Sequence, residues 1–275
     1  MDHLALDEQP VVPFHREAGA GPGVVCVHCN ASSSAQWRPL MDLLAPRHRV
    51  LAPDTHGAGR GPAWPTGRTP SLSDEVDLLE PVFQRAGGSV ALIGHSYGGA
   101  VALLAALRWP ERVHTLVLYE PALFALVDAL SPPPNAADGI REAVVQAAAA
   151  VAVGDRSAAA EVFIDYWMGD GSWFAKPEAQ RSAIEQAVAH VQVWGRVLFG
   201  ETTPLAAFRA LGMPVLLMQG SETTAAARAV ATLLAQTLPQ VETLSLQGLG
   251  HMGPITHPAP VNAAINAFLQ RHPPR

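Results

Sequence analysis

Short apolar runs alternate along this chain with longer segments in which apolar positions recur at helical spacing. The short runs predict strands at residues 24–27, 50–52, 89–93, 113–119, 214–218 and 241–246. The longer segments predict helices at residues 36–44, 72–86, 100–109, 225–238 and 259–269. This alternation is typical of a mostly parallel β-sheet with helices on both faces, so the predicted fold class is α/β.

The alternation stops between residues 121 and 203. Three consecutive prolines at 132–134 interrupt the chain, and helical segments follow at 139–168 and 177–198. Two helical blocks exceed what a single crossover between neighbouring strands requires. We therefore predict a core domain formed by residues 1–120 and 204–275, with a helical cap at 121–203 over the carboxyl edge of the sheet.

Composition and charge narrow the class of protein. A chain of 275 residues that is 49% hydrophobic suits one large domain, or one domain with an insertion. A net charge of −6 without a dense basic face disfavours nucleic acid as a partner. Residues 1–8 lack the order of a signal peptide, and no apolar run reaches the ~18 residues of a membrane span. We expect a cytoplasmic protein that acts on a small molecule, away from membranes, and the sequence predicts no oligomeric state.

Cys26 and Cys29 are the two cysteines, at C-x-x-C spacing. That spacing also occurs in redox and zinc sites, but zinc requires further ligands and the chain has no second cysteine pair. Both residues fall within or at the end of the strand predicted at 24–27. We expect an inert, buried pair and no metal site.

The stretch from Gly94 to Gly98 reads Gly-His-Ser-Tyr-Gly and lies between a predicted strand and a predicted helix. A serine in this setting matches the G-x-S-x-G nucleophile elbow, a tight turn that excludes bulky neighbours. Ser96 is therefore the candidate nucleophile, and the alternative is a glycine-rich turn with an idle serine. The neighbouring His95 is expected to turn its side chain elsewhere.

A serine hydroxyl is a poor nucleophile until a base takes its proton. His251 lies in a glycine-flanked loop, residues 248–252, between the last predicted strand and the last predicted helix. It can reach Ser96 from the same edge of the sheet. His257 is the alternative base, but it lies beside Pro258 near the start of the final helix.

The base in turn needs a carboxylate that fixes its tautomer and stabilises the imidazolium. Glu120 ends the strand that follows the serine helix, and a carboxylate there would face the catalytic edge. Glu222 is the alternative acid, in the turn after the strand at 214–218. Thr223, the next residue, occupies the position in that turn at which the carboxylate partner of the histidine is usually found.

An oxyanion that forms on the substrate needs backbone N–H groups to stabilise it. The amide of Tyr97, at the amino terminus of the serine helix, is one candidate. The amide of Asn30, in the loop after the first predicted strand, is the other. Asn30 would otherwise serve as a helix cap, and the two roles are compatible.

Over essentially its full length the chain resembles the α/β-hydrolase fold family, whose catalytic order is nucleophile, acid, histidine. Residues 27–30, V-H-C-N, resemble the oxyanion loop of that family, usually written H-G-x, with Cys29 in place of the glycine. Residues 54–60 are similar to the D-x-x-G-x-G-x turn that follows the next strand. The resemblance implies a structural role for that turn.

A closer resemblance concerns one group of haloalkane dehalogenases. It rests on H-x-N, a serine-rich turn, Trp37, and a glutamate after the strand that follows the nucleophile helix. In that group this glutamate is the triad acid, which favours Glu120. Dehalogenases carry an aspartate nucleophile, usually followed by tryptophan, whereas this chain has Ser96 and Tyr97. Displacement of halide and opening of epoxides need a carboxylate nucleophile, so these activities are disfavoured, and serine suits acyl transfer.

These residues predict a serine hydrolase that cleaves a small, mostly apolar carboxylic ester through an acyl-enzyme. Hydrolysis of a carbon–carbon bond or a lactone, and perhydrolysis, would use the same triad and stay open, as does a ligand-binding receptor on this fold. Serine acyl transfer needs no cofactor, so none is expected. Aromatic residues of the cap are candidates for the substrate pocket, namely Phe124, Trp167 and Trp194.

Overall fold

The computed structural model describes residues 12–274. Residues 1–8, on which the expectation about a signal peptide rests, lie outside that range. Among the described residues, no helix combines the length and the apolar character that crossing a membrane requires.

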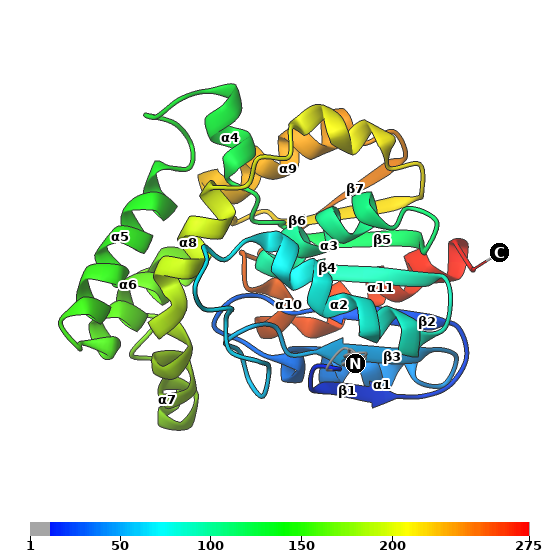
Figure 1. Ribbon diagram of the computed structural model, residues 1–275, viewed down its shortest axis with the longest axis horizontal. Helices are drawn as coiled ribbons and strands as arrows, with labels where there is room; N and C mark the ends of the chain where they lie inside the picture. Colours follow the sequence, from blue (N-terminus) through cyan, green and yellow to red (C-terminus); the bar gives the residue numbers. More distant parts are fainter. Residues whose placement is uncertain (1–11, 275) are drawn as a thin grey trace, which may run out of the picture.

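Residues 12–274 contain one seven-stranded sheet with the strand order β1-β3-β2-β4-β5-β6-β7 (Figure 1). The strands are β1 (His15–Ala18), β2 (Gly23–Val27), β3 (Arg49–Pro53), β4 (Val90–His95), β5 (Val113–Tyr119), β6 (Val215–Gly220) and β7 (Val241–Leu246). All neighbours pair in parallel except β1, which runs antiparallel to β3 at the edge. The mostly parallel sheet confirms the predicted fold class. The sequence pattern missed β1 because this edge strand has no apolar run.

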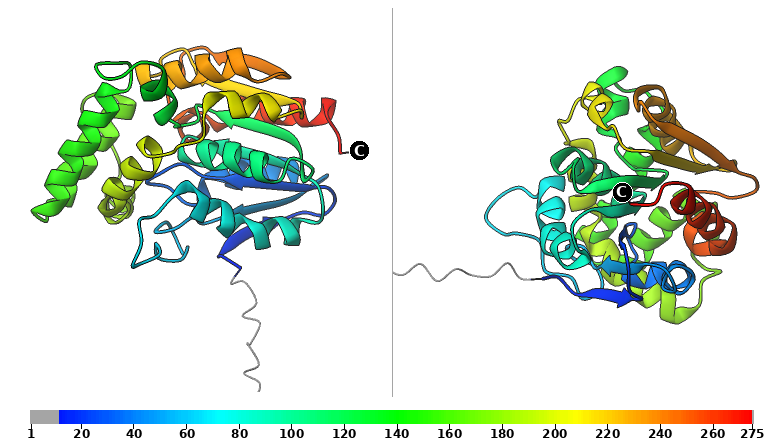
Figure 2. Two further views of the ribbon diagram at one scale, coloured as in Figure 1. Left: turned by 45° about the horizontal axis from the view of Figure 1, so that its top comes forward. Right: turned by 90° about the vertical axis from the view of Figure 1, so that its right-hand side faces the viewer.

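Helices cover both faces of the sheet. One face carries α1 (Arg38–Leu44) and α11 (Pro258–Arg271), and the other carries α2 (Leu72–Ala86), α3 (Tyr97–Arg108) and α9 (Ala225–Thr237) (Figure 2). Alternate residues of β2 divide between two apolar clusters. Val24 and Cys26 pack with α1 and α11, whereas Val25 and Val27 pack with α2 and α3. Successive side chains of a strand point to opposite faces, so a strand covered on both sides is apolar throughout.

Five α-helices lie between β5 and β6, in the segment predicted as a cap. They are α4 (Ala125–Leu130), α5 (Asp138–Ala152), α6 (Arg156–Met168), α7 (Glu178–Ala187) and α8 (Val191–Phe199). Helices α5 to α8 gather at one end of the molecule, opposite the carboxyl terminus (Figure 1). The division into core and cap at residues 121 and 203 stays a prediction.

Two helices predicted in this segment are each divided. The helix predicted at 139–168 breaks at Gly154, whose φ of 86° is left-handed and incompatible with a continuing helix. Asp155 then starts α6 as its cap, since its carboxylate accepts a hydrogen bond from the Ala158 N–H at 2.9 Å. The helix predicted at 177–198 is interrupted by a 3-10 turn at Val188–His190. The short helix α4 was not predicted.

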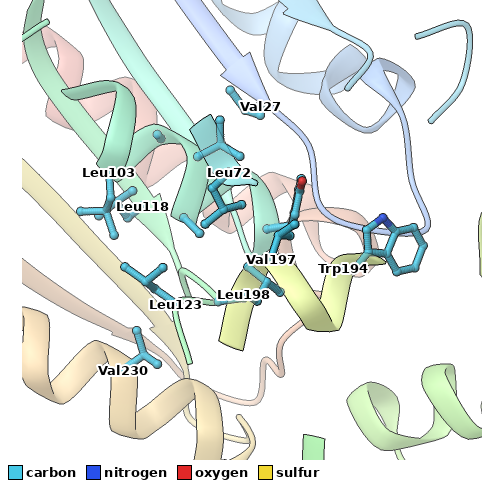
Figure 3. Close-up of a cluster of buried hydrophobic side chains, with 14 of the residues drawn as sticks. Val27, Leu72, Leu103, Leu118, Leu123, Trp194, Val197, Leu198 and Val230 are labelled. Atoms are coloured by element: carbon cyan, nitrogen blue, oxygen red, sulfur yellow. The ribbon is translucent and has the colours of Figure 1, made fainter. Parts of the chain in front are cut away.

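The apolar core continues from the sheet into the helices between β5 and β6. Leu118 of β5 and Leu123 belong to the same buried cluster as Trp194, Val197 and Leu198 of α8 (Figure 3). The helices between β5 and β6 are therefore held against the sheet by a shared apolar interior as well as by their chain connections.

Candidate active site

The candidate nucleophile lies at a sharp turn between β4 and α3. Ser96 has φ 55° and ψ −115°, a conformation that is rare outside glycine and that marks strained functional positions. A Cβ atom at Gly98 would lie 2.2 Å from the Val27 carbonyl oxygen, and one at Gly94 would lie 2.3 Å from that of Gly98. The glycines of this motif are thus required by close backbone contacts, as expected for a nucleophile elbow.

Three side chains from distant parts of the sequence meet at the carboxyl edge of the sheet. The Ser96 hydroxyl lies 2.8 Å from Nε2 of His251, and Nδ1 of His251 lies 2.6 Å from Oε2 of Glu120. All three side chains are buried. With Nε2 facing a hydroxyl and Nδ1 facing a carboxylate, the neutral ring carries its proton on Nδ1. The structure thus brings together the residues that the sequence favours as nucleophile, base and acid, namely Ser96, His251 and Glu120.

The Glu120 carboxylate is held by β6 and the turn after it. Its Oε1 accepts a hydrogen bond from the Gly220 N–H at 2.7 Å, and its Oε2 accepts one from the Thr223 hydroxyl at 2.5 Å. Glu120 itself has a left-handed φ of 45°, and it directly follows β5. Thr223, at the usual position of the acid, therefore donates a hydrogen bond to a carboxylate supplied by the neighbouring strand.

The alternative acid and base do not reach the site. Glu222 is exposed, and its Oε1 accepts a hydrogen bond from the Ser221 hydroxyl at 3.1 Å. His257 is also exposed, with Nδ1 2.9 Å from the Thr256 hydroxyl.

His95 does not turn away from the site, contrary to the expectation from sequence. Its ring lies beside that of His251, with the centroids 5.4 Å apart, and its Nε2 donates a hydrogen bond to the His251 carbonyl at 2.9 Å. Burial lowers the pKa of His95 well below its ordinary value, with a further contribution from His251. The Gln36 amide donates to Nδ1 of His95 at 3.0 Å and accepts from the Cys29 N–H at 3.2 Å. A neutral His95 thus links the loop of the base to the loop of Asn30.

The backbone N–H groups of Asn30 and Tyr97 are free to bind an oxyanion. Tyr97 is the first residue of α3, where a backbone N–H has no partner within the helix. Within residues 12–274, neither N–H donates a hydrogen bond to another protein group. Asn30 lines the same pocket as Ser96.

The loop that carries Asn30 adopts its shape without a glycine. Ala31, with φ 53°, is its left-handed residue, and Cys29 keeps a negative φ. The cysteine at the position where the family usually has glycine therefore introduces no backbone strain. His28 anchors the loop, since its Nδ1 lies 2.7 Å from the Cys29 carbonyl and its Nε2 accepts from the Thr55 N–H at 3.2 Å.

The side chain of Tyr97 points away from the nucleophile. Its hydroxyl donates a hydrogen bond to Oε1 of the buried Glu75 at 2.9 Å, and Oε2 of the same carboxylate contacts Nδ1 of His56 at 3.0 Å. Burial, followed by the charge of Glu75, raises the pKa of Tyr97 well above its ordinary value. Tyr97 thus offers the site only its backbone.

The turn at residues 54–60 has a structural role, as the sequence resemblance implied. Oδ1 of Asp54 accepts a hydrogen bond from the Ser34 N–H at 2.6 Å, and Oδ2 accepts one from the Arg60 N–H at 2.8 Å. Asp54 thereby joins its own turn to the segment that follows the Asn30 loop.

A pocket of about 200 Å³ opens beside Ser96 and His251, and a small recess of about 20 Å³ also borders Ser96. Trp167 lines both spaces, whereas Phe124 and Trp194 line the recess and not the pocket. The Trp167 ring also stacks on the imidazole of His251, with the centroids 3.8 Å apart and the planes 20° from parallel. All three predicted aromatic residues thus lie around the nucleophile, and Trp167 also contacts the candidate base.

Cys26 and Cys29 are both buried and free, with no disulfide between them. Burial raises the pKa of the Cys29 thiol to about 12 and shifts that of Cys26 further in the same direction. Because the thiolate is the reactive form, we expect neither cysteine to react with a disulfide reagent such as DTNB in the folded protein. Both should react in guanidinium chloride. Rapid reaction of one thiol before unfolding would contradict the assignment of an inert pair.

A model of the alpha/beta hydrolase fold family matches residues 22–258. The match covers most of the chain, and the fold and the strand-turn-helix around Ser96 agree with it. The chain belongs to the α/β-hydrolase fold family.

Two curated relatives align with nearly the whole chain. The 2-(acetamidomethylene)succinate hydrolase of Mesorhizobium japonicum is 26% identical over 92% of this chain and 90% of that protein. The pimeloyl-[acyl-carrier protein] methyl ester esterase of Aeromonas hydrophila is 26% identical over 91% of this chain and 96% of that protein. The crystal structure of an alpha/beta hydrolase from Sphaerobacter thermophilus has a TM-score of 0.73 and 26% identity, covering 93% of this chain and 95% of that one. Other curated relatives are 32% to 37% identical, but the chain spans only 36% to 43% of their length.

Proposed function

We propose that this protein is a serine hydrolase that cleaves a small, mostly apolar carboxylic ester through an acyl-enzyme. The observation that carries the proposal is the unbroken series of contacts from Ser96 to His251 and from His251 to Glu120, at 2.8 Å and 2.6 Å. This is the arrangement that a serine needs in order to lose its proton during attack.

In the proposed reaction, Nε2 of His251 takes the hydroxyl proton as Oγ of Ser96 attacks the ester carbonyl carbon. Nδ1 keeps its proton and donates to Glu120, whose negative charge stabilises the imidazolium. The Trp167 ring lies over the face of the same imidazole and adds a cation–π attraction once the ring is charged.

The negative charge on the tetrahedral oxygen would be stabilised by the backbone N–H groups of Tyr97 and Asn30. His251 then returns the proton to the leaving alcohol. A water molecule, deprotonated by the same imidazole, attacks the acyl-enzyme and releases the carboxylic acid and Ser96. Every proton thus passes through one ring nitrogen, and Ser96 ends in its starting state.

The spaces around the nucleophile support a compact substrate. The recess of about 20 Å³ holds little more than one small group, and the aromatic residues Phe124 and Trp194 line it. A short apolar portion of an ester fits such a space, whereas a long branched portion does not.

Labelling with a fluorophosphonate tests this proposal directly, because such reagents attach covalently to activated serines. We expect one adduct, located at Ser96 by peptide mass spectrometry, and none in the Ser96→Ala variant. Hydrolysis of p-nitrophenyl acetate should fall in proportion to the labelled fraction. A folded protein that takes up no label and cleaves no ester would contradict the proposal and favour a receptor that binds its ligand without cleaving it.

A further inference from the structure

Lys176 is the only lysine in the sequence. The chain has 18 lysines and arginines in total, and all the others are arginine. This one lysine lies in the wall of the pocket that contains Ser96 and His251. It is also the only lysine, arginine, aspartate or glutamate among the residues that line that pocket.

The turn that carries Lys176 is fixed in place. It joins α6 to α7, and the fully buried Trp173 anchors it to the core. The Asp165 carboxylate accepts hydrogen bonds from the N–H groups of Gly171 and Trp173, both at 2.8 Å. The Lys176 N–H donates to the Trp173 carbonyl at 3.1 Å. The lysine backbone is therefore held by the same anchors.

The Lys176 ammonium has no ion-pair partner in the described part of the chain, residues 12–274. Partial burial lowers its pKa, and no neighbouring charge contributes to the shift. A cation beside apolar walls loses solvation and gains nothing in return until an anion comes within reach. The side chains Phe163, Ile164 and Ile184 provide such walls.

We propose that Lys176 binds a carboxylate on the substrate, so that the ester carries a small apolar group on one side and a longer apolar portion ending in a carboxylate on the other. The small group would occupy the recess of about 20 Å³, and the longer portion would extend along the pocket of about 200 Å³ towards the lysine. This assignment rests on the proposed ester hydrolysis at Ser96. It narrows the proposed substrates to esters that carry a terminal carboxylate.

A single carboxylate matches the site better than a phosphate. One ammonium balances one negative charge, whereas a dianion would leave a second charge uncompensated beside apolar side chains. Lysine also acts as a compact charge on a flexible stem, which suits a single oxygen at the end of a chain. An arginine would add a planar fork that fills more of the pocket.

Kinetics on matched esters test the assignment. Monomethyl adipate and methyl hexanoate share the acyl chain length and differ in the terminal carboxylate, and 6-acetoxyhexanoate and hexyl acetate form the pair of opposite orientation. We expect the wild type to prefer the charged member of at least one pair, with hydrolysis followed by pH-stat. Lys176→Met should lower kcat/KM for that ester by about 10- to 100-fold and leave its neutral partner within about threefold. Lys176→Arg should retain most of the preference.

Arg196→Met is the matched control. Arg196 is an exposed cation of α8 and does not line the pocket. Its loss changes the net charge of the chain by the same amount, and kcat/KM for both members of each ester pair should stay unchanged. The assignment would be overturned if Lys176→Met lowered kcat/KM equally for charged and neutral esters, or if the wild type did not prefer the charged ester. Ester hydrolysis at Ser96 would still stand in either case.

A second readout is independent of catalysis and of how the variants fold. Reductive methylation with ¹³C-formaldehyde labels only Lys176 and the terminal amine, and it preserves the positive charge. We expect 6-hydroxyhexanoate, which carries a single carboxylate, to shift the Lys176 resonance in the NMR spectrum and 1,6-hexanediol to leave it unchanged. The two proposals can fail separately. If the resonance shifts but ester turnover is unchanged in the Ser96→Ala variant, the carboxylate site is supported and the proposed function is refuted. No shift at any concentration of 6-hydroxyhexanoate up to its solubility would refute the site.

Discussion

Replacing Ser96 with alanine is expected to lower kcat for p-nitrophenyl acetate by about 10⁶-fold, the scale seen when a serine nucleophile is removed from a complete triad. The reason is that the Ser96 hydroxyl is the group placed 2.8 Å from Nε2 of His251. Without it no acyl-enzyme forms, and only binding and the backbone donors remain. Steady-state kinetics with active-site titration of the wild type measure the effect.

Ser34→Ala is the matched control for this substitution. It removes another buried hydroxyl, one whose oxygen has no hydrogen-bond partner among the described residues. We expect its kcat to stay within about twofold of the wild type, because no polar contact is lost. Circular dichroism should show that both variants are folded. Turnover by a folded Ser96→Ala variant at the rate of the wild type would exclude Ser96 as the nucleophile.

Replacing Glu120 with glutamine is expected to lower kcat by about 10⁴-fold, the scale of the equivalent change in a serine protease triad. A carboxylate accepts the Nδ1 proton of His251 and keeps Nε2 free for the serine. An amide can present its NH₂ group to Nδ1 and so favour the wrong tautomer. The new side chain must also fit the donors of Gly220 and Thr223, which both point at the present carboxylate.

Glu222→Gln separates the two candidate acids. The carboxylate of Glu222 is exposed and accepts a hydrogen bond from the Ser221 hydroxyl. We therefore expect kcat of Glu222→Gln to remain within about twofold of the wild type. The double variant Ser96→Ala/Glu120→Gln should be no slower than Ser96→Ala alone, because residues that act as a unit are not additive. A loss in Glu222→Gln together with an active Glu120→Gln variant would reverse the assignment.

The sequence pointed to one candidate nucleophile and one candidate base because each is marked locally. Ser96 lies between glycines at the junction of a strand and a helix, and His251 lies in a glycine-flanked loop at the same edge of the sheet. The acid has no such mark. Glu120 and Glu222 both follow strands that are neighbours in the sheet, so both arrive at the same edge. The left-handed φ of Glu120 accompanies the orientation of its carboxylate towards His251, and the residue type does not encode that angle.

Contacts that join distant loops were beyond sequence reasoning. The link from Gln36 through His95 to the His251 carbonyl depends on three segments that meet only in the folded chain. The Thr223 contact to Glu120 likewise connects two strand ends. Lys176 differs, because the sequence alone carries its signal: it is the only lysine of the chain. Its place in the pocket wall required the structure.

The Trp167 side chain of α6 stacks on His251, the proposed catalytic base, and so forms part of the surroundings of that imidazole. Replacing this helical segment with that of a relative, or moving it to another scaffold, would therefore also change the contacts of His251. A chimera with no flat side chain at position 167 would leave the imidazole uncovered and its orientation less defined. Libraries that vary the segment to change selectivity would best hold this tryptophan constant.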